Sequence, residues 1–240
     1  MKIETLFDNA DFRAFSKPSG LLTIPDRYHP EIPNLVSMAR QKFGSLFVVH
    51  RLDKDTSGIV CFAKNEAAHR HLSQCFENRE ITKYYQAIVG GTPYETANSI
   101  RKPITHDPAN KGRMMITAKG KEARTDYEVL DNWKHFSLLN IQLFTGRTHQ
   151  IRVHLKDIGH PIVADPFYGD GQPFLLSSVK RKYRLSDDEL EERPVLSRLA
   201  LHATELSFTD EKGETVHIQS PLPKDMAAMV KLLKKWDKPD

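Results

Sequence analysis

A run of nine residues, His50-Arg51-Leu52-Asp53-Lys54-Asp55-Thr56-Ser57-Gly58, places charged and polar side chains between two apolar segments. Polar loops that follow buried strands are common places for active sites. An aspartate can act as a nucleophile when it is ionised and lies beside a cation that compensates for its burial. Arg51 precedes Asp53 by two positions, which places both on the same side of an extended backbone. Asp53 is therefore the candidate nucleophile.

Two other kinds of site share part of this pattern. Asp53, Asp55 and Gly58 are spaced like the start of a calcium-binding loop. The twelfth position of such a loop requires a bidentate glutamate, and here it is Lys64, so the cation would lose a ligand. The run Asp55–Gly58 resembles the aspartic protease signature, whose chemistry needs two carboxylates that share a proton. No second Asp-Thr pair occurs in the sequence, so only a dimeric protease remains open.

A second stretch, Gly146–His154, can supply another cation. We expect a helix that Thr148 caps and Gly159 closes. Thr148 and Arg152 then lie on one stripe of that helix, so that Arg152 could point inward toward Asp53. By itself, the stretch rather favours an ordinary basic helix face. Its two histidines are five residues apart, a poor spacing for two metal ligands on one helix, so we expect no metal.

Short apolar segments with alternating polarity predict strands, and segments with a period near four predict helices. The expected strands are Phe12–Lys17, Leu46–Val49, Gly58–Ala63, Lys83–Val89, Ala123–Trp133, His135–Phe144, Pro161–Ala164, Leu199–Phe208 and Thr215–Gln219. The expected helices are Asn34–Phe43, 65–78, 148–158 and Lys224–Trp236. Consecutive strands pair, which favours an α+β fold with a mixed, largely antiparallel sheet. Residues 170–193 fit no strand and indicate an irregular insertion.

The chain has 240 residues, which suits one large domain or two small ones. Its formal charge of +4 is too small to indicate nucleic acid by itself. Basic residues gather, however, at 101–124 and 180–184, where they either follow a phosphate backbone or form a solvated loop. No apolar stretch is long enough for a membrane span, and the N-terminus lacks a signal core. We therefore expect a cytoplasmic protein whose two cysteines, Cys61 and Cys75, are buried free thiols.

Most of the chain resembles the RluA-type pseudouridine synthases. The nine-residue run matches their signature His-Arg-Leu-Asp-x-x-Thr-Ser-Gly. Further motifs follow in the order of the family: Lys17–Gly20, the strand 83–90, Gly146–His154, His160–Ile162 with Asp165 and Tyr168-Gly169, and Leu201–Ala203. Several matches in register make a chance resemblance implausible.

The resemblance implies a bifurcated, mostly antiparallel sheet with flanking helices and a central catalytic cleft. Residues 1–240 would be a single catalytic domain, with two subdomains around the cleft and without the S4-type RNA-binding module of many family members. It implies no cofactor and no metal. Asp53 would act on a uridine flipped out of the RNA, Tyr85 would stack on the uracil and transfer a proton, and Arg152 would pair with Asp53.

Other residues are expected to bind RNA or to support the active site. They are His50, Arg51, Thr56, Arg147, Lys17, Lys111 and Arg113. The partner implied is ribosomal or transfer RNA, and neither the RNA nor the position modified follows from the sequence. No obligate protein partner is evident, and we expect a monomer. The alternative is a non-catalytic RNA-binding or RNA-chaperone protein on the same scaffold, which would not need Asp53.

Overall fold

The computed structural model describes residues 3–185 and 191–239. The chain forms two compact units, which are described separately. Unit 1 is Met1–Tyr85 with His202–Pro221, and unit 2 is Gln86–Leu201 with Leu222–Asp240. The chain passes from one unit to the other inside a strand, between Tyr85 and Gln86. That both units form a single domain around one cleft stays a prediction.

Unit 1 is built on a sheet with the strand order β1-β2-β4-β11-β5, to which β3 and β12 are added as partners of β4 and β11. The strands are β1 (Glu4–Asp8), β2 (Phe12–Lys17), β3 (Phe47–Val48), β4 (Ser57–Ala63), β5 (Thr82–Gly90), β11 (Leu201–Thr209) and β12 (Thr215–Gln219). Every residue of β4 is buried. β4 pairs antiparallel with β2 and parallel with β11, which makes β4 a central strand.

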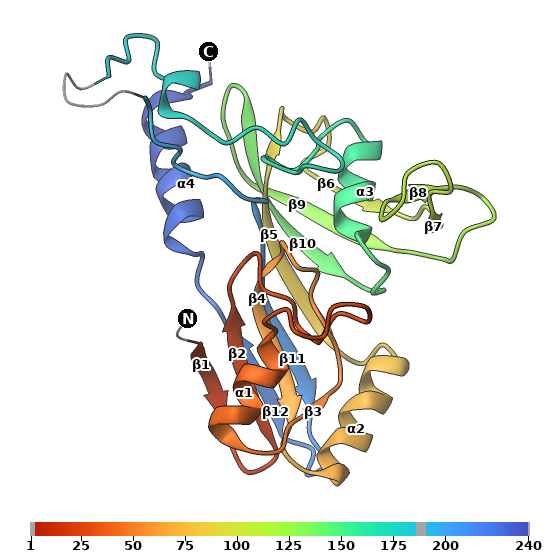
Figure 1. The fold of residues 1–240 in the computed structure, drawn as a ribbon. Coiled ribbons are helices and arrows are strands. Elements are labelled where there is room, and N and C mark those ends of the chain that lie inside the picture. The colour runs from red at the N-terminus through yellow and green to blue at the C-terminus, as the bar shows by residue number, and fades with distance from the viewer. Residues whose placement is uncertain (1–2, 186–190, 240) are drawn as a thin grey trace. The chain divides into compact units, whose positions relative to one another are not determined.

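Two helices complete unit 1 (Figure 1). In α1 (Leu35–Phe43), the side chain of Asn34 accepts a hydrogen bond from the backbone N–H of Ser37. In α2 (Glu66–Glu77), Asn65 accepts in the same way from Ala68. Such N-caps satisfy backbone donors that the first helical turn leaves without partners. Ala68, Leu72 and Cys75 of α2 pack into the core together with Phe12, Ile59 and Phe208.

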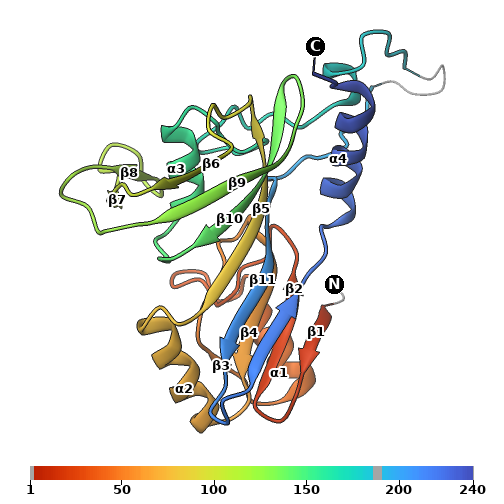
Figure 2. The same cartoon turned by 180° about the vertical axis from the view of Figure 1, so that it is seen from behind.

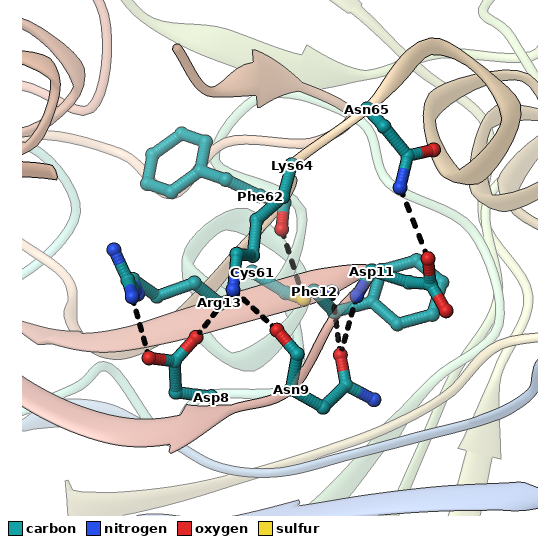
Figure 3. Close-up of polar contacts among 9 residues, drawn as sticks. All are labelled: Asp8, Asn9, Asp11, Phe12, Arg13, Cys61, Phe62, Lys64 and Asn65. Atoms are coloured by element: carbon teal, nitrogen blue, oxygen red, sulfur yellow. Dashed lines mark hydrogen bonds and ion pairs between the residues drawn. The ribbon is translucent and has the colours of Figure 1, made fainter. Parts of the chain in front are cut away.

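The end of β4 that lies away from the nine-residue motif is tied to the β1–β2 turn (Figure 3). Lys64 Nζ donates to Asp8 Oδ1 over 3.0 Å and also to the carbonyl of Asn9. Asn65 Nδ2 donates to Asp11 Oδ1 over 3.0 Å. These contacts fix the register of the strands at one end, so that the opposite end can carry a loop.

Unit 2 has the strand order β5-β10-β9-β6 and a separate two-stranded hairpin, β7–β8 (Figure 2). The strands are β6 (Ala97–Ile100), β7 (Ile104–His106), β8 (Met114–Ile116), β9 (Thr125–Asn132) and β10 (Phe136–Leu143). The helices are α3 (Gln150–Asp157), the short 3-10 helix η1 (Leu176–Ser178) and α4 (Lys224–Trp236). Ile104 and Met114 of the hairpin pack with Val153 of α3 and with Tyr168.

The predicted fold class is confirmed, because the structure is α+β with a mostly antiparallel sheet. Within the described residues, no helix is long and apolar enough to cross a membrane. Both cysteines are buried and unbridged, as predicted. The predicted insertion at 170–193 contains η1 and a bridge from Phe174 to Leu196, and its residues 186–190 lie outside the described residues.

The predicted cap of α3 is wrong. The helix begins at Gln150, and its N-cap is His149, which has a φ of 54° and makes no side-chain capping bond. Thr148 therefore lies outside the helix and shares no stripe with Arg152. The predicted end is confirmed: Gly159 has a φ of 86°, and its N–H donates to the carbonyl of Lys156, as in a glycine C-cap.

Two predicted strands are shorter than expected. The segment Pro161–Ala164 forms only an isolated bridge between Ile162 and Val89, and the positive φ of 56° at Ala164 ends the extended conformation. The segment Leu46–Val49 is reduced to β3, whose two residues are half-buried rather than buried. β1, β6, β7 and β8 were not predicted, because they are short and their polar residues mask the alternation.

Candidate active site

The nine-residue motif forms a loop between β3 and β4 in unit 1, and a second loop, residues 18–23, holds it in place. Four hydrogen bonds join the two loops. They run from Thr23 Oγ1 to the carbonyl of Leu52 (2.9 Å), from the N–H of Leu52 to Thr23 Oγ1 (3.1 Å), from the N–H of Gly20 to the carbonyl of Lys54 (2.9 Å), and from Ser19 Oγ to the carbonyl of Asp55 (2.6 Å). Because the bonds engage the backbone on both sides of position 53, they fix the path of the chain at Asp53.

Lys17 reinforces this contact from inside. Its side chain is fully buried at the end of β2. Its Nζ donates to the carbonyls of Pro18 (3.1 Å), Leu21 (2.7 Å) and Lys54 (2.9 Å). A buried ammonium requires such acceptors, because leaving it without them costs several kcal/mol. The structure therefore places Lys17 as a support of the motif loop, and its burial argues against direct contact with RNA.

The far side of the motif rests on β11. Gly58 has a φ of 117°, and a Cβ at this position would lie 2.3 Å from the carbonyl oxygen of Ala203. Only glycine permits so close an approach of the two strands. Next to it, the hydroxyl of Ser57 lies 2.9 Å from Nδ1 of His202, whose Nε2 lies 3.1 Å from Ser220 Oγ. The motif Leu201–Ala203 thus packs against the end of the loop and supports it.

His50, at the start of the motif, is held by contacts with β4 and α2. Its Nε2 accepts a hydrogen bond from the backbone N–H of Cys61 over 3.0 Å, and its ring stacks on Phe76 at 4.8 Å. Burial, and secondarily the positive charge of Lys83, lowers the pKa of His50 to about 3. The imidazole is therefore neutral at physiological pH and serves as a hydrogen-bond acceptor.

Asp53 and Tyr85 both belong to unit 1, where the charge of Asp53 acts on the hydroxyl of Tyr85. Tyr85, on β5, has 8% of its surface exposed. Burial raises the pKa of its hydroxyl, and the negative charge of Asp53 raises it further. The hydroxyl therefore keeps its proton at neutral pH. Thr56 is buried, and its N–H donates to the carbonyl of Asp53 over 3.2 Å, whereas Arg51 is exposed.

Arg152 lies in unit 2, where Asp165 holds it. Its Nε and Nη2 donate to the two carboxylate oxygens of Asp165 over 2.8 and 2.6 Å. Both side chains are buried, with exposed fractions of 1% and 0%. Asp165 Oδ1 also accepts the N–H of Phe167 and of Tyr168. A bidentate pair of this kind fixes the plane of the guanidinium. Because Asp53 lies in unit 1, its pairing with Arg152 stays a prediction.

The residues around α3 are held by further buried hydrogen bonds. Gln150 Nε2 donates to the carbonyl of Arg124, and its Oε1 accepts from Thr145 Oγ1. The hydroxyl of Tyr168 accepts the N–H of Met114 over 2.7 Å and lies 2.9 Å from Nδ1 of His149. In the part of the chain that the structure describes, no three His, Cys, Asp or Glu side chains gather so as to hold a metal ion.

The predicted RNA-binding residues of unit 2 surround the β7–β8 hairpin. Lys111 is exposed, and Arg113 is half-buried. Arg147 Nε donates to the carbonyl of Glu122 over 3.0 Å, which places it beside the same segment. In contrast, Lys102 forms an ion pair with Asp157. The basic segment 101–124 is therefore divided into exposed cations and cations that neighbouring carboxylates already neutralise.

Comparison with known proteins relates these loops and α3 to one protein family. A sequence model of RNA pseudouridylate synthases matches residues 11–157, which include the loops at 18–23 and 50–58 and the whole of α3. The chain belongs to this family. The resemblance inferred from the motifs is thereby confirmed, and neither the calcium loop nor the protease gains support.

Relatives in the pseudouridylate synthase family extend over nearly the whole chain. An RNA pseudouridine synthase of Bacillus subtilis (strain 168) is 34% identical over 98% of this chain and 74% of the relative. The ribosomal large subunit pseudouridine synthase D of Nitrosomonas europaea is 36% identical over 97% of this chain, and a Chloroflexus aurantiacus RNA pseudouridine synthase is 37% identical over 91%. The chain spans 65% of the length of each of these last two.

A solved structure of this family supports the fold. The human RNA pseudouridylate synthase domain containing 1 matches with a TM-score of 0.71 at 26% identity, over 100% of this chain and 97% of that one. Sequence reasoning missed the contact of Thr23 with Leu52 and gave Asp165 no role. A sequence signal existed only for Asp165, which is a polar residue of a family motif. No sequence pattern indicates that the hydroxyl of Thr23 bonds to a distant backbone group.

Proposed function

We propose that this chain is an RNA pseudouridine synthase, an isomerase that converts specific uridines of structured RNA to pseudouridine with Asp53 as its nucleophile. Membership of the family supports the reaction class. The observation that supports the assignment of residues is the loop that carries Asp53, because Thr23 and Lys17 hold its backbone by hydrogen bonds on either side of this residue. A carboxylate held in this way can attack a substrate without first reorganising.

The reaction breaks the C1′–N1 bond of the uridine and forms a C1′–C5 bond after the base has turned. C5 loses a proton and N1 ends with one, so atoms and charge balance without an oxidant, cofactor or metal. Uridine stacked in RNA must first be extruded, which costs a few kcal/mol. Contacts with the bases and phosphates around it offset this cost.

Asp53 has two possible routes in this reaction. It either adds to C1′ of the ribose or removes the C2′ proton, which gives a glycal intermediate. Tyr85 would stack on the uracil. Because its hydroxyl is held protonated, its resting form is a donor, and it is suited to give a proton to the departing base.

Arg152 would pair with Asp53 and hold it charged and oriented. Its bidentate contact with Asp165 supports this role, since it keeps the guanidinium in one plane. The exposed cations of the segment 101–124 would bind phosphates of the RNA. We propose ribosomal or transfer RNA as the substrate, the cytoplasm as the location and a monomer as the active form. The name of the Nitrosomonas relative favours ribosomal RNA.

The proposed nucleophile is tested by Asp53→Asn, which preserves shape but removes the negative charge. We expect turnover to fall by at least about three orders of magnitude with RNA binding largely intact. The measurement is pseudouridine formed in RNA from cells that lack the gene. Asp55→Asn is the matched control, because it makes the same change two residues later in the same loop. Multiple turnover by the Asp53 variant would contradict the assignment of the nucleophile, whereas RNA binding without any pseudouridine formed by the native protein would favour an RNA-binding protein without catalysis.

The proposed RNA-binding segment is tested by Lys119→Gln combined with Lys121→Gln. Both lysines are exposed. If each contacts a phosphate, the slope of log K against log salt should decrease in magnitude by about 1.4–1.8. The control combines Lys212→Gln with Lys234→Gln, since both of these lysines are exposed and paired with aspartates. An unchanged slope in the first variant would mean that these two lysines belong to the solvated surface and do not contact phosphates.

A further inference from the structure

Phe167 of unit 2 is an apolar ring that stays at the surface among cationic groups. It is 36% exposed. The guanidinium carbon of Arg152 lies 5.2 Å from the centre of the ring, and that of Arg113 lies 5.7 Å from it. The imidazole of His149 is 5.6 Å away and tilted by 57°. Its neighbour Tyr168, by contrast, is buried with its hydroxyl bonded.

The backbone of Phe167 is held by a hydrogen bond, even though the ring is exposed. Its backbone N–H donates to Asp165 Oδ1 over 2.9 Å, and the same carboxylate forms the bidentate pair with Arg152. The chain therefore holds the ring beside Arg152 rather than letting it turn into the core. Burying a phenylalanine is favourable by about 1.5–3 kcal/mol, so an exposed ring that is fixed in this way indicates a contact with something outside the chain.

The charges around the ring favour an anionic, aromatic partner. Arg113 and Lys111 lie on the β7–β8 hairpin, where Lys111 is exposed. Asp107 is the acidic residue of the same turn; its carboxylate accepts hydrogen bonds from Ala109 and Asn110, and Arg113 helps to lower its pKa. Exposed aromatic rings bordered by arginine are the usual stacking surface for unpaired nucleobases.

We propose that Phe167 is a stacking platform for a nucleobase of the RNA, namely that of a nucleotide adjacent to the target uridine, and that Arg113 binds the phosphate of that nucleotide. The inference rests on the proposed function in one respect. It places the nucleotide next to the target because Phe167 lies beside Arg152, the residue proposed to hold the nucleophile. Tyr85 remains assigned to the target uracil.

The experiment uses synthetic stem-loop RNAs that carry 2-aminopurine on the 5′ or the 3′ side of a single loop uridine. Stacking quenches the fluorescence of this base. We expect quenching of one of the two probes by the native protein and by Phe167→Trp. Phe167→Leu should lose that quenching and bind about 5- to 150-fold more weakly, which is the range for one stacked base. Tyr94→Leu is the control, because Tyr94 is a fully exposed ring elsewhere in unit 2.

Several results would overturn the inference. They are quenching of neither probe by the native protein, undiminished quenching and affinity in Phe167→Leu, or an equal loss in Tyr94→Leu. Pseudouridine formation in cellular RNA is measured separately. If the native protein forms pseudouridine and Phe167→Leu binds normally, the platform fails and the proposed function stands. If no pseudouridine forms but quenching depends on Phe167, the platform stands and the proposed reaction fails. Circular dichroism verifies that each variant is folded.

Discussion

Among the described residues, each unit buries a long basic side chain, and the two are fixed in different ways. Lys17 of unit 1 donates to backbone carbonyls of two loops. Arg152 of unit 2 is bound by a carboxylate and bordered by two aromatic rings. A compact ammonium can serve several dipoles at once, whereas a planar guanidinium matches one carboxylate. The comparison suggests that Lys17 joins segments of the chain and that Arg152 is oriented for a partner.

Of the variants that test this difference between the units, Asp165→Asn should lower the free energy of unfolding the most. The substitution leaves the buried guanidinium of Arg152 without its carboxylate, which typically costs about 3–5 kcal/mol. Urea unfolding followed by tryptophan fluorescence reports on unit 2, because Trp133 and Trp236 both belong to it.

Two further variants sharpen the result. Asp170→Asn, an exposed acid in the same segment, should change the unfolding free energy little. Arg152→Met combined with Asp165→Leu should recover much of the loss, since replacing both charges removes the unpaired one. An Asp165→Asn protein as stable as the native one would show that the ion pair does not hold Arg152.

A smaller effect is expected from Lys17→Met in unit 1. Methionine fills similar space but leaves the carbonyls of Pro18, Leu21 and Lys54 without this donor. Buried acceptors that lose their partner cost about 1–3 kcal/mol. The measurement is urea unfolding followed by circular dichroism, with Lys212→Met as an exposed control. Turnover should fall more than RNA affinity, because the loop that carries Asp53 loosens. Equal losses of affinity and turnover would instead indicate that Lys17 touches RNA.

The effect expected to be smallest at neutral pH concerns the start of the motif loop, and it depends on pH. Folding lowers the pKa of His50 to about 3, whereas an unfolded histidine titrates near 6.5. Between these values the unfolded chain binds the additional proton. The contribution of His50 to stability is therefore present above about pH 6.5 and is lost as the pH falls toward about 3, with a slope of up to about 1.4 kcal/mol per pH unit.

His50→Gln tests this dependence, because its amide oxygen can still accept the N–H of Cys61. Unfolding free energies measured from about pH 7 to about pH 4 should show a shallower slope in the variant. His154, whose pKa burial also lowers, remains in both proteins and contributes equally. His29→Gln, an exposed histidine, should leave the slope unchanged. A variant with the native slope would mean that His50 titrates normally.

Much of the fold was predictable because β2, β4, β5 and α4 carry the alternation or the helical period that their burial requires. The start of α3 was not predictable. Thr148 is a residue type that is common at N-caps, and it is the left-handed backbone of His149 that makes the helix begin at Gln150. The hairpin β7–β8 was missed because strands of three residues show too little pattern.

In the candidate site, too, some features were predictable from the sequence and others were not. The motif predicts Asp53 because its residue types and spacing are specific, and it predicts that His50 orders the loop, with which the hydrogen bond from Cys61 agrees. The burial of Lys17 was not predictable, because lysine is almost never fully buried unless it is paired, and its partners are carbonyls that carry no sequence signal. Asp165 was visible only as part of a motif, because its contact with Arg152 spans thirteen positions that include a helix end.

The placement of β11 has a consequence for biosynthesis. This strand lies between β4 and β5 in the order of the sheet, yet it follows them by more than a hundred residues in the chain. On the ribosome, β4 and β5 therefore emerge long before the strand that separates them. Until then each has an edge with unpaired backbone groups, which other strands can join wrongly. The newborn chain thus passes through a long interval in which protection by a chaperone matters most.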